Sequence, residues 1–168
     1  MPFWYAVKDG DSRLRGIVNR HYSARHYRDG RRVAKSVGPG EYMALMTQDC
    51  LAAWVWRKFI DDSGQKGVNC AVFRNEGEVL SSELIKEAVQ LAQERWPGER
   101  LYTYVNPAKI RSTNPGFCFL YVGWQKCGLT KGGLIILEYC QERAQGKLPE
   151  LTLRELCVSG PGYSIEQN

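Results

Sequence analysis

The chain has 168 residues, enough for one hydrophobic core, and 43% of them are hydrophobic, which is ordinary for a globular protein and argues against an intrinsically disordered chain. It has no run of about 18 apolar residues, and its N-terminal segment lacks the basic and apolar regions of a secretory signal, so we expect a cytoplasmic protein with no membrane partner. The formal net charge is +5, and its distribution along the chain is more informative than its total.

The predicted elements begin with a strand over residues 3–9, followed by a basic segment that reaches residue 36. The most basic stretch of the chain covers residues 13–35, and Asp29 is its only acidic residue. Its cations are Arg13, Arg15, Arg20, Arg25, Arg28, Arg31, Arg32 and Lys35. Such a stretch is either a solvated loop or a surface for phosphate groups of a nucleic acid or cofactor. His21, Tyr22, His26 and Tyr27 are interleaved with the arginines, and aromatic rings in this setting suit stacking on bases.

After a turn at Gly38-Pro39-Gly40, two apolar runs flank Thr47-Gln48-Asp49. They predict an antiparallel hairpin of residues 41–47 and 51–58. A strand over residues 68–76 follows, with Val68, Cys70 and Val72 expected on one face.

The clearest helix follows this strand. Its apolar residues recur with a helical period, and they are Leu84, Ile85, Ala88, Leu91 and Ala92. Ser81 or Ser82 is expected to cap it, and Pro97-Gly98 to end it.

A strand over residues 100–107, a helix beginning near Pro115 and a strand over residues 132–140 complete the predicted core. The tail from about residue 146 predicts at most one strand, in LTLREL at residues 151–156. Strands that alternate with helices in the second half predict a mixed α/β sheet, and we expect one domain over residues 1–168.

The six cysteines contain no CxxC pair, and the two histidines lie far from them in sequence. The cysteines are Cys50, Cys70, Cys118, Cys127, Cys140 and Cys157. This spacing disfavours a structural zinc site, and the absence of an export signal favours reduced, mostly buried thiols over disulfides.

The segment CAVFRNEGEVLSSELIKEAV places a strand, a short loop and a helix N-terminus in succession. A helix N-terminus and the loop before it offer backbone N–H groups that bind phosphate or pyrophosphate, although ordinary helices begin in the same way. The later segments RLYTYVNP and NPGFCFLYVGWQKCG resemble the end of the GNAT acetyltransferase fold, a mixed, mostly antiparallel central sheet flanked by helices.

That resemblance implies acetyl-CoA or a related acyl-CoA as cofactor. The positions it assigns to the cofactor are Asn75, Gly77, Ser81, Ser82 and Asn106, with Asn114 as the alternative to Asn106. Tyr121, before Gly123-Trp124, matches the tyrosine that protonates the thiolate leaving group, or is simply part of the core. One departure is that the family's Q/R-x-x-G-x-G/A loop is missing, with only Gly77 in its place.

A second resemblance covers residues 15–138. The motifs NRHYSARHY, AVFRNEG followed by LSSELI, PGFCF and TKGGLIILE, in this order, resemble the phage Mom family, which is GNAT-like. The resemblance implies a transferase that converts adenine in double-stranded phage DNA to a carbamoylmethyl-type N6 adduct, which protects the DNA from restriction in the bacterial host. The target is better defined by this resemblance than the donor, because an N-alkyl adduct does not follow from ordinary acyl transfer.

Under this hypothesis the catalytic candidates are His21 as general base, Tyr22 as a stacking or proton-donating group, Arg74 and Tyr121. The DNA-binding candidates are Arg20, Arg25, His26, Tyr27, Arg28, Arg31 and Lys131. The plainer interpretations are that His21 and Tyr22 only touch phosphate, that Arg74 pairs with Glu76 or Glu83, and that Lys131 is solvated. Iron is conceivable, with His21, His26, Asp29 and Tyr22 as ligands, but their spacing matches no metal motif and no ligand is assigned.

Two other functions stay open. One is a GNAT acetyltransferase that acts on a protein, a tRNA-borne amine or a small molecule, and the other is a non-catalytic DNA-binding module. Salt-dependent DNA binding separates the DNA hypotheses from the acetyltransferase, and product formation separates the enzyme from the module.

Overall fold

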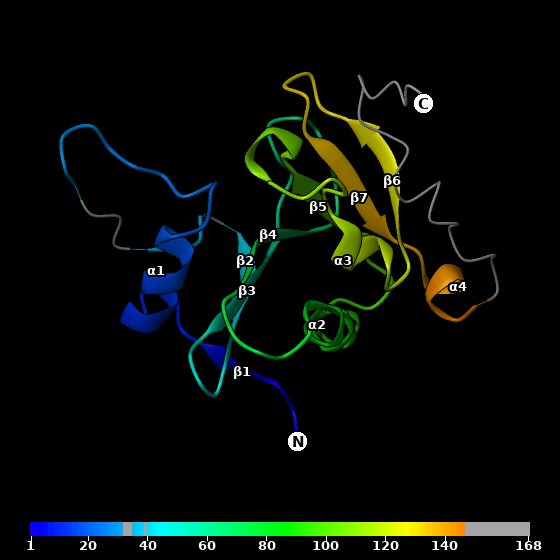
Figure 1. Cartoon of the computed structure of the whole chain (residues 1–168), viewed down its shortest axis with the longest axis horizontal. Helices are drawn as coiled ribbons and strands as arrows, with labels where there is room; N and C mark the ends of the chain where they lie inside the picture. Colours follow the sequence, from blue (N-terminus) through cyan, green and yellow to red (C-terminus); the bar gives the residue numbers. More distant parts are fainter. Residues whose placement is uncertain (32–34, 39, 147–168) are drawn as a thin grey trace, which may run out of the picture. The chain divides into compact units, whose positions relative to one another are not determined.

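The computed structural model describes residues 1–31, 35–38 and 40–146 (Figure 1). The described residues form two compact units, the first up to Thr103 and the second from Tyr104 onward. The strand expected at residues 151–156 lies outside the described residues, as do Arg32, Pro39 and Cys157.

The first unit is built on five strands and two helices. These are β1 (Trp4–Val7), α1 (Ser12–Asn19), β2 (Glu41–Thr47), β3 (Ala52–Lys58), β4 (Val68–Asn75), α2 (Ser81–Arg95) and the first three residues of β5 (Leu101–Val105). Strands β1 to β4 pair antiparallel with their sequence neighbours, and β4 pairs parallel with β5. The predicted hairpin of β2 and β3 is confirmed, and its turn is closed by a bond from the Cys50 amide to the Thr47 carbonyl at 2.9 Å.

A β-bulge at Ala71 interrupts β4. Val72 pairs with Val55, whereas Cys70 pairs with Trp56, so Ala71 is the extra residue. Because Val55 and Trp56 face opposite sides of the sheet, Val72 and Cys70 do too. The expectation that Val68, Cys70 and Val72 share one face is therefore wrong. The parallel ladder between β4 and β5 covers Val68–Cys70 and Leu101–Thr103 and ends just before the bulge.

Helix α1 covers one face of this sheet (Figure 1). The buried residues of this core are Leu14, Ile17, Val18, Val37, Ala44, Met46, Ala53, Val55 and Val72. The helix begins at Asp11, whose carboxylate accepts a hydrogen bond from the Arg13 amide at 2.9 Å. This helix was not predicted, because its sequence stood out only as the start of a basic segment.

Helix α2 covers the opposite face through Leu84, Ile85, Ala88, Val89 and Ala92. The indole of Trp4 donates to the Leu84 carbonyl at 2.8 Å, and the indole of Trp56 donates to the Ala88 carbonyl at 2.9 Å. Buried indole N–H groups need such partners, and these two bonds fix the helix on the sheet.

The predicted helix is thus confirmed, but its cap is not the expected one. Leu80 is the N-cap residue and makes no side-chain capping bond, and Ser81 is already the first helical residue. The prediction that Ser81 or Ser82 caps α2 is wrong, because the loop before it turns one residue earlier.

The second unit continues from the end of β5. Its elements are a 3-10 turn (η1, Pro107–Lys109), α3 (Phe117–Leu120), β6 (Trp124–Leu129), β7 (Ile135–Tyr139) and α4 (Gln141–Ala144). Strands β6 and β7 form an antiparallel hairpin around Trp124, which is fully buried and meets the rings of Phe119 and Tyr139 edge to face. The helix expected near Pro115 is a single turn that begins at Phe117, with Gly116 as its N-cap residue, and β6 was not predicted.

The seven strands follow the order β1-β2-β3-β4-β5-β7-β6, with β5 running from the first unit into the second. This is the mixed, mostly antiparallel sheet with flanking helices that the resemblance implied. In the described part of the chain, no helix is long and apolar enough to cross a membrane.

Candidate functional site

Two adjoining cavities lie beside α1 in the first unit, of about 430 Å³ and about 460 Å³, within the range of small-ligand sites. We call the first the strand cavity, because its wall includes Ala71 and Val72 at the β4 bulge, and the second the loop cavity. Both are lined by Arg15, Arg25 and Tyr27, so the two are neighbours.

The walls of these cavities are cationic. The strand cavity is lined by Arg15, Arg25, Lys35 and Arg57, and the loop cavity by Arg15, Arg25 and Arg31. Among the described residues, neither lining includes an aspartate or glutamate. A concave surface with one sign of charge concentrates ligands of the opposite sign, so both cavities suit an anion.

A charged cluster forms next to the strand cavity. Arg20 donates two hydrogen bonds to the Glu76 carboxylate, at 2.8 and 2.7 Å, and Arg74 donates to the same carboxylate. These two guanidinium groups hold the pKa of Glu76 at about 2. Arg74 therefore has the pairing partner that the plainer interpretation gave it, and the cluster ties the end of β4 to the end of α1.

His21 lies at this cluster, and its ring stacks on Tyr22 with centroids 4.3 Å apart. Burial and the nearby Arg74 guanidinium lower the pKa of His21 to about 4, so the ring is neutral at pH 7. The Ser23 amide donates to Nδ1 at 3.2 Å, which places the remaining ring proton on Nε2.

The Ser23 hydroxyl connects this ring to the strand cavity. Its Oγ lies 2.7 Å from His21 Nδ1, and Ser23 is part of the cavity wall. A hydroxyl that donates to a neutral imidazole can pass on a proton taken from a bound group. The structure therefore brings His21, Tyr22 and Arg74 together, and it adds Ser23 as the residue that reaches the cavity.

The predicted DNA-binding residues of this segment are all exposed. Arg25, His26, Tyr27 and Arg31 line one or both cavities, and the Arg31 guanidinium lies 4.8 Å from the centre of the Tyr27 ring. Arg28 is exposed and lines neither cavity, while Arg20 belongs to the charged cluster.

The loop between β4 and α2 is folded onto itself. Asn75 accepts a hydrogen bond from the Gly77 amide at 3.0 Å and donates to the Val79 carbonyl at 2.7 Å and to Ser81 Oγ at 3.1 Å. The Glu76 amide donates to the Leu51 carbonyl at 2.8 Å. The amides of Glu76 and Gly77 are thus used within the protein.

These contacts decide how well the loop suits the diphosphate of coenzyme A. A diphosphate needs free amides and low negative charge, but two amides are used and Glu76, Glu78 and Glu83 surround the loop. The residues present therefore do not fit the diphosphate at this place. Ser82, the remaining predicted contact of this loop, lies in the first turn of α2 and is half-buried.

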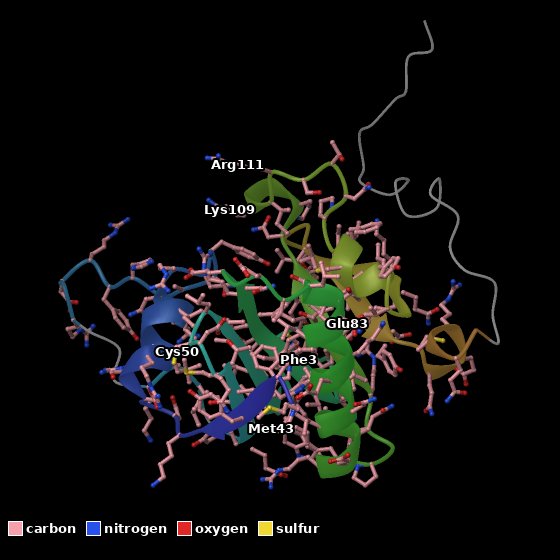
Figure 2. All side chains as sticks on the ribbon, turned by 60° about the horizontal axis from the view of Figure 1, so that its bottom comes forward. Phe3, Met43, Cys50, Glu83, Lys109 and Arg111 are labelled. Atoms are coloured by element: carbon pink, nitrogen blue, oxygen red, sulfur yellow. The ribbon has the colours of Figure 1, made fainter. Side chains whose placement is uncertain are left out.

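Three predicted site residues belong to the second unit. Tyr121 follows the last residue of α3, and the centre of its ring lies 5.9 Å from the centre of the Phe117 ring. Its side chain is 66% exposed, so it is not a core residue. Asn106 caps the 3-10 turn by accepting from the Ala108 amide at 3.0 Å. Lys131 is exposed in the β6–β7 turn, and Lys109 and Arg111 extend from the segment around η1 (Figure 2).

In the described ranges, no three histidine, cysteine, aspartate or glutamate side chains are grouped as metal ligands. The five cysteines in these ranges are free thiols.

Sequence reasoning missed three residues of the site. Ser23 was noted only as part of a motif, Glu76 only as a partner for Arg74, and Arg57 not at all. The signal for Arg57 was weak: it is one cation at the end of an apolar strand, and only the pairing of β3 with β4 brings it near the basic segment.

The sequence matches no protein-family model and no curated protein. Among solved structures, an acyl-CoA N-acyltransferase from Pseudomonas aeruginosa is similar, with a TM-score of 0.53 and 15% identity over 82% of this chain and 98% of that one. The strand order and this likeness together show that the chain has the acyl-CoA N-acyltransferase (GNAT) fold.

Proposed function

We propose that this chain is a transferase that modifies the N6 amine of adenine in double-stranded DNA, as in the phage Mom family that its motifs resemble. The observation that carries the proposal is the strand cavity. It is lined by four cations, faces the bulge of β4 and adjoins a neutral histidine. By the same resemblance, the adduct would protect phage DNA from restriction in the host cell.

The cations of both cavities match a polyanionic substrate. Phosphate contacts supply most of the affinity of a protein for DNA and position it without reading its sequence. The exposed arginines around Tyr27 supply such contacts, and Tyr22 and Tyr27, which are 42% and 43% exposed, offer rings for stacking on an unpaired base. Base flipping is needed, because the N6 amine of a paired adenine is held within the duplex.

The chemistry requires removal of a proton from a weak nucleophile. The lone pair of the adenine amine is delocalised into the ring, so the amine becomes strongly acidic only as its bond to the transferred group forms and the bond between that group and its donor breaks. At that stage a base of lowered pKa accepts the proton, and Ser23 Oγ relays it to Nδ1 of His21. Arg74, fixed by Glu76, would face negative charge that develops on the transferred group.

The donor is the part of the proposal that the fold supports least. The acyl-CoA N-acyltransferase fold favours an acyl thioester, whereas the β4–α2 loop does not suit the diphosphate of coenzyme A. The fold therefore also supports a second candidate, an acyltransferase that acts on an amine of a protein, a tRNA-borne amine or a small molecule. Calorimetric titration with acetyl-CoA tests this candidate, because tight binding without any DNA product would favour it.

Mass spectrometry of nucleosides tests the first candidate. Plasmid DNA is isolated from bacteria with and without the expressed chain, and a new adenosine-derived mass is expected only with expression. The Ser23→Ala and His21→Gln variants should lose most of the product, whereas Arg95→Gln, an exposed arginine on α2, should keep it. Unmodified DNA in the presence of abundant folded protein would overturn the proposal.

A further inference from the structure

Arg57 is held in position at the wall of the strand cavity. Its guanidinium lies 3.7 Å from the centre of the Phe59 ring and packs directly on the backbone of Gly38. A methyl group at Gly38 would meet its Cζ and Nη2 atoms at 2.7 Å. A long flexible side chain is thus held in one place by a ring and a glycine, which lowers the entropy lost when it binds a ligand.

The pKa of Arg57 is lowered from its usual value. Burial and the charge of Arg25 both lower the pKa of Arg57, and the opposing effects of Tyr102 and Asp62 are smaller. A bound anion would reverse this effect, because it favours the charged form of a guanidinium.

Arg15 adds an independent observation from α1. Its Nε atom is buried and, within the described residues, has no hydrogen-bond partner, although buried donors nearly always have one. Arg15 lines the same cavity as Arg57 and Arg25. An arginine with an unpartnered donor, in the wall of a cavity whose described lining has no carboxylate, points to an acceptor supplied by a ligand.

We propose that the strand cavity is a phosphate subsite in which Arg15, Arg25 and Arg57 bind one phosphate group. Guanidinium groups suit this ligand, because their planar donors match two phosphate oxygens at once. The inference rests on the proposed function for its main source of phosphate, the DNA backbone beside the flipped adenine. The same subsite chemistry would serve a phosphate carried by a small-molecule donor.

Binding of fluorescent oligonucleotide duplexes to the full chain tests the subsite, measured over a range of salt concentrations. Arg57→Gln should weaken binding roughly ten-fold, and should reduce the slope of log K against log salt by about 0.9, which corresponds to one phosphate contact. Arg57→Lys should restore the slope but not the full affinity, because lysine keeps the charge and lacks the planar fork. Arg95→Gln, which removes an exposed arginine packed on the Trp96 ring, is the matched control and should bind as the wild type.

Gly38→Ala provides a variant that keeps every charge. The added methyl group displaces the tip of a flexible side chain rather than backbone, so the fold should survive, as thermal unfolding would show. Weaker binding with an unchanged melting temperature is the expected result.

Inorganic phosphate and acetyl-CoA, used as separate probes in thermal shift measurements, identify the source of the phosphate. Loss of duplex binding in Arg57→Gln together with competition by inorganic phosphate supports the DNA backbone. If Arg57→Gln binds the duplex as the wild type does, but inorganic phosphate or acetyl-CoA no longer raises its melting temperature, the result supports a subsite for a phosphorylated donor. If Arg57→Gln and Gly38→Ala match the wild type with all three probes, the subsite is refuted.

Nucleoside mass spectrometry separates this outcome from the fate of the proposed function. If the wild type modifies DNA and Arg57→Gln binds all three probes as the wild type does, the subsite alone is refuted. Unmodified DNA with an Arg57-dependent phosphate effect would refute the proposed function alone.

Discussion

At the scale of single residues, His21 connects the stability of the protein to its proposed chemistry. Its ring is kept neutral by burial and by Arg74, and it accepts hydrogen bonds from Ser23. Neutrality has a cost at acidic pH, because the unfolded chain takes up a proton that the folded protein excludes.

We therefore expect the free energy of unfolding to fall as the pH falls from about 6.5 towards 4. The folded-state pKa is lowered from 6.5 to about 4, so the unfolded state binds more protons in this window and stability rises with pH. The full shift corresponds to roughly 3 kcal/mol, and partial exposure of the ring reduces the expected effect to about 2 kcal/mol. Urea unfolding between pH 4.5 and 7 measures it.

The variant His21→Gln serves as the control for this window. Its unfolding free energy should depend much less on pH above about 4.5. The carboxylates with lowered pKa values, which include Asp49 as well as Asp11 and Glu76 at about 2, lose their stabilising charge only at lower pH. Equal slopes for the wild type and the variant would contradict the assignment.

The sequence predicted the members of this cluster better than their roles. His21 and Arg74 stood out as a histidine among arginines and as a cation after apolar residues, and the structure brings them together. Glu76 could not be chosen over Glu83 without the fold, because only the turn after β4 decides which carboxylate reaches Arg74. Arg57 required the register of β3 on β4.

At the scale of elements, α2 begins without a side-chain cap. Leu80 is 69% exposed at the N-cap, with backbone angles of φ −59° and ψ 132° that suit a serine or aspartate. Leu80→Ser should therefore raise the free energy of unfolding by about 1 kcal/mol, because the hydroxyl would accept a bond from a first-turn amide. Chemical denaturation compares it with Leu80→Ala, which removes the same exposed side chain without adding a cap and should show no such gain.

The start of β4 depends on a glycine. Gly67 has φ +123°, and a methyl group there would clash with the Arg100 carbonyl oxygen, next to the point where β4 and β5 pair. Gly67→Ala should lower the free energy of unfolding by roughly 3 kcal/mol, from backbone strain and this clash together. Gly64→Ala is the control, because φ is +79° there and the methyl group would meet nothing within 4 Å, so only strain of about 1 kcal/mol is expected. Similar losses for the two variants in thermal denaturation would contradict the clash.

The elements with strong patterns were predictable, and the weakly patterned ones were not. The β2–β3 hairpin and α2 carry long apolar periods, and they were found within a residue or two of their observed ends. Helix α1 has only Leu14, Ile17 and Val18 facing the core, diluted by arginines and Gly16, so its period was too short to recognise. Strand β6 was missed because five of its six residues are exposed or half-buried.

At the scale of the whole molecule, the five cysteines of the described residues are free, and those on β4 and in α3 are buried or half-buried. The fold is therefore held by packing and hydrogen bonds in these ranges. A reductant such as dithiothreitol should leave the thermal unfolding midpoint unchanged, because no cross-link of the unfolded chain would be broken. Differential scanning calorimetry with and without reductant measures this, and a fall of several degrees would reveal a cross-link.

The beginning of the chain is attached to the middle of α2. The amides of Phe3 and Trp4 both donate to the Glu87 carboxylate at 3.0 Å, and Phe3 lies beside the helix in Figure 2. During synthesis on the ribosome, the hydrogen bonds from Phe3 and Trp4 to Glu87 cannot form until more than eighty further residues have been made. The nascent first unit therefore acquires its final arrangement late, when α2 has emerged, and a slowly translated stretch before residue 87 would prolong the exposure of the apolar face of the sheet.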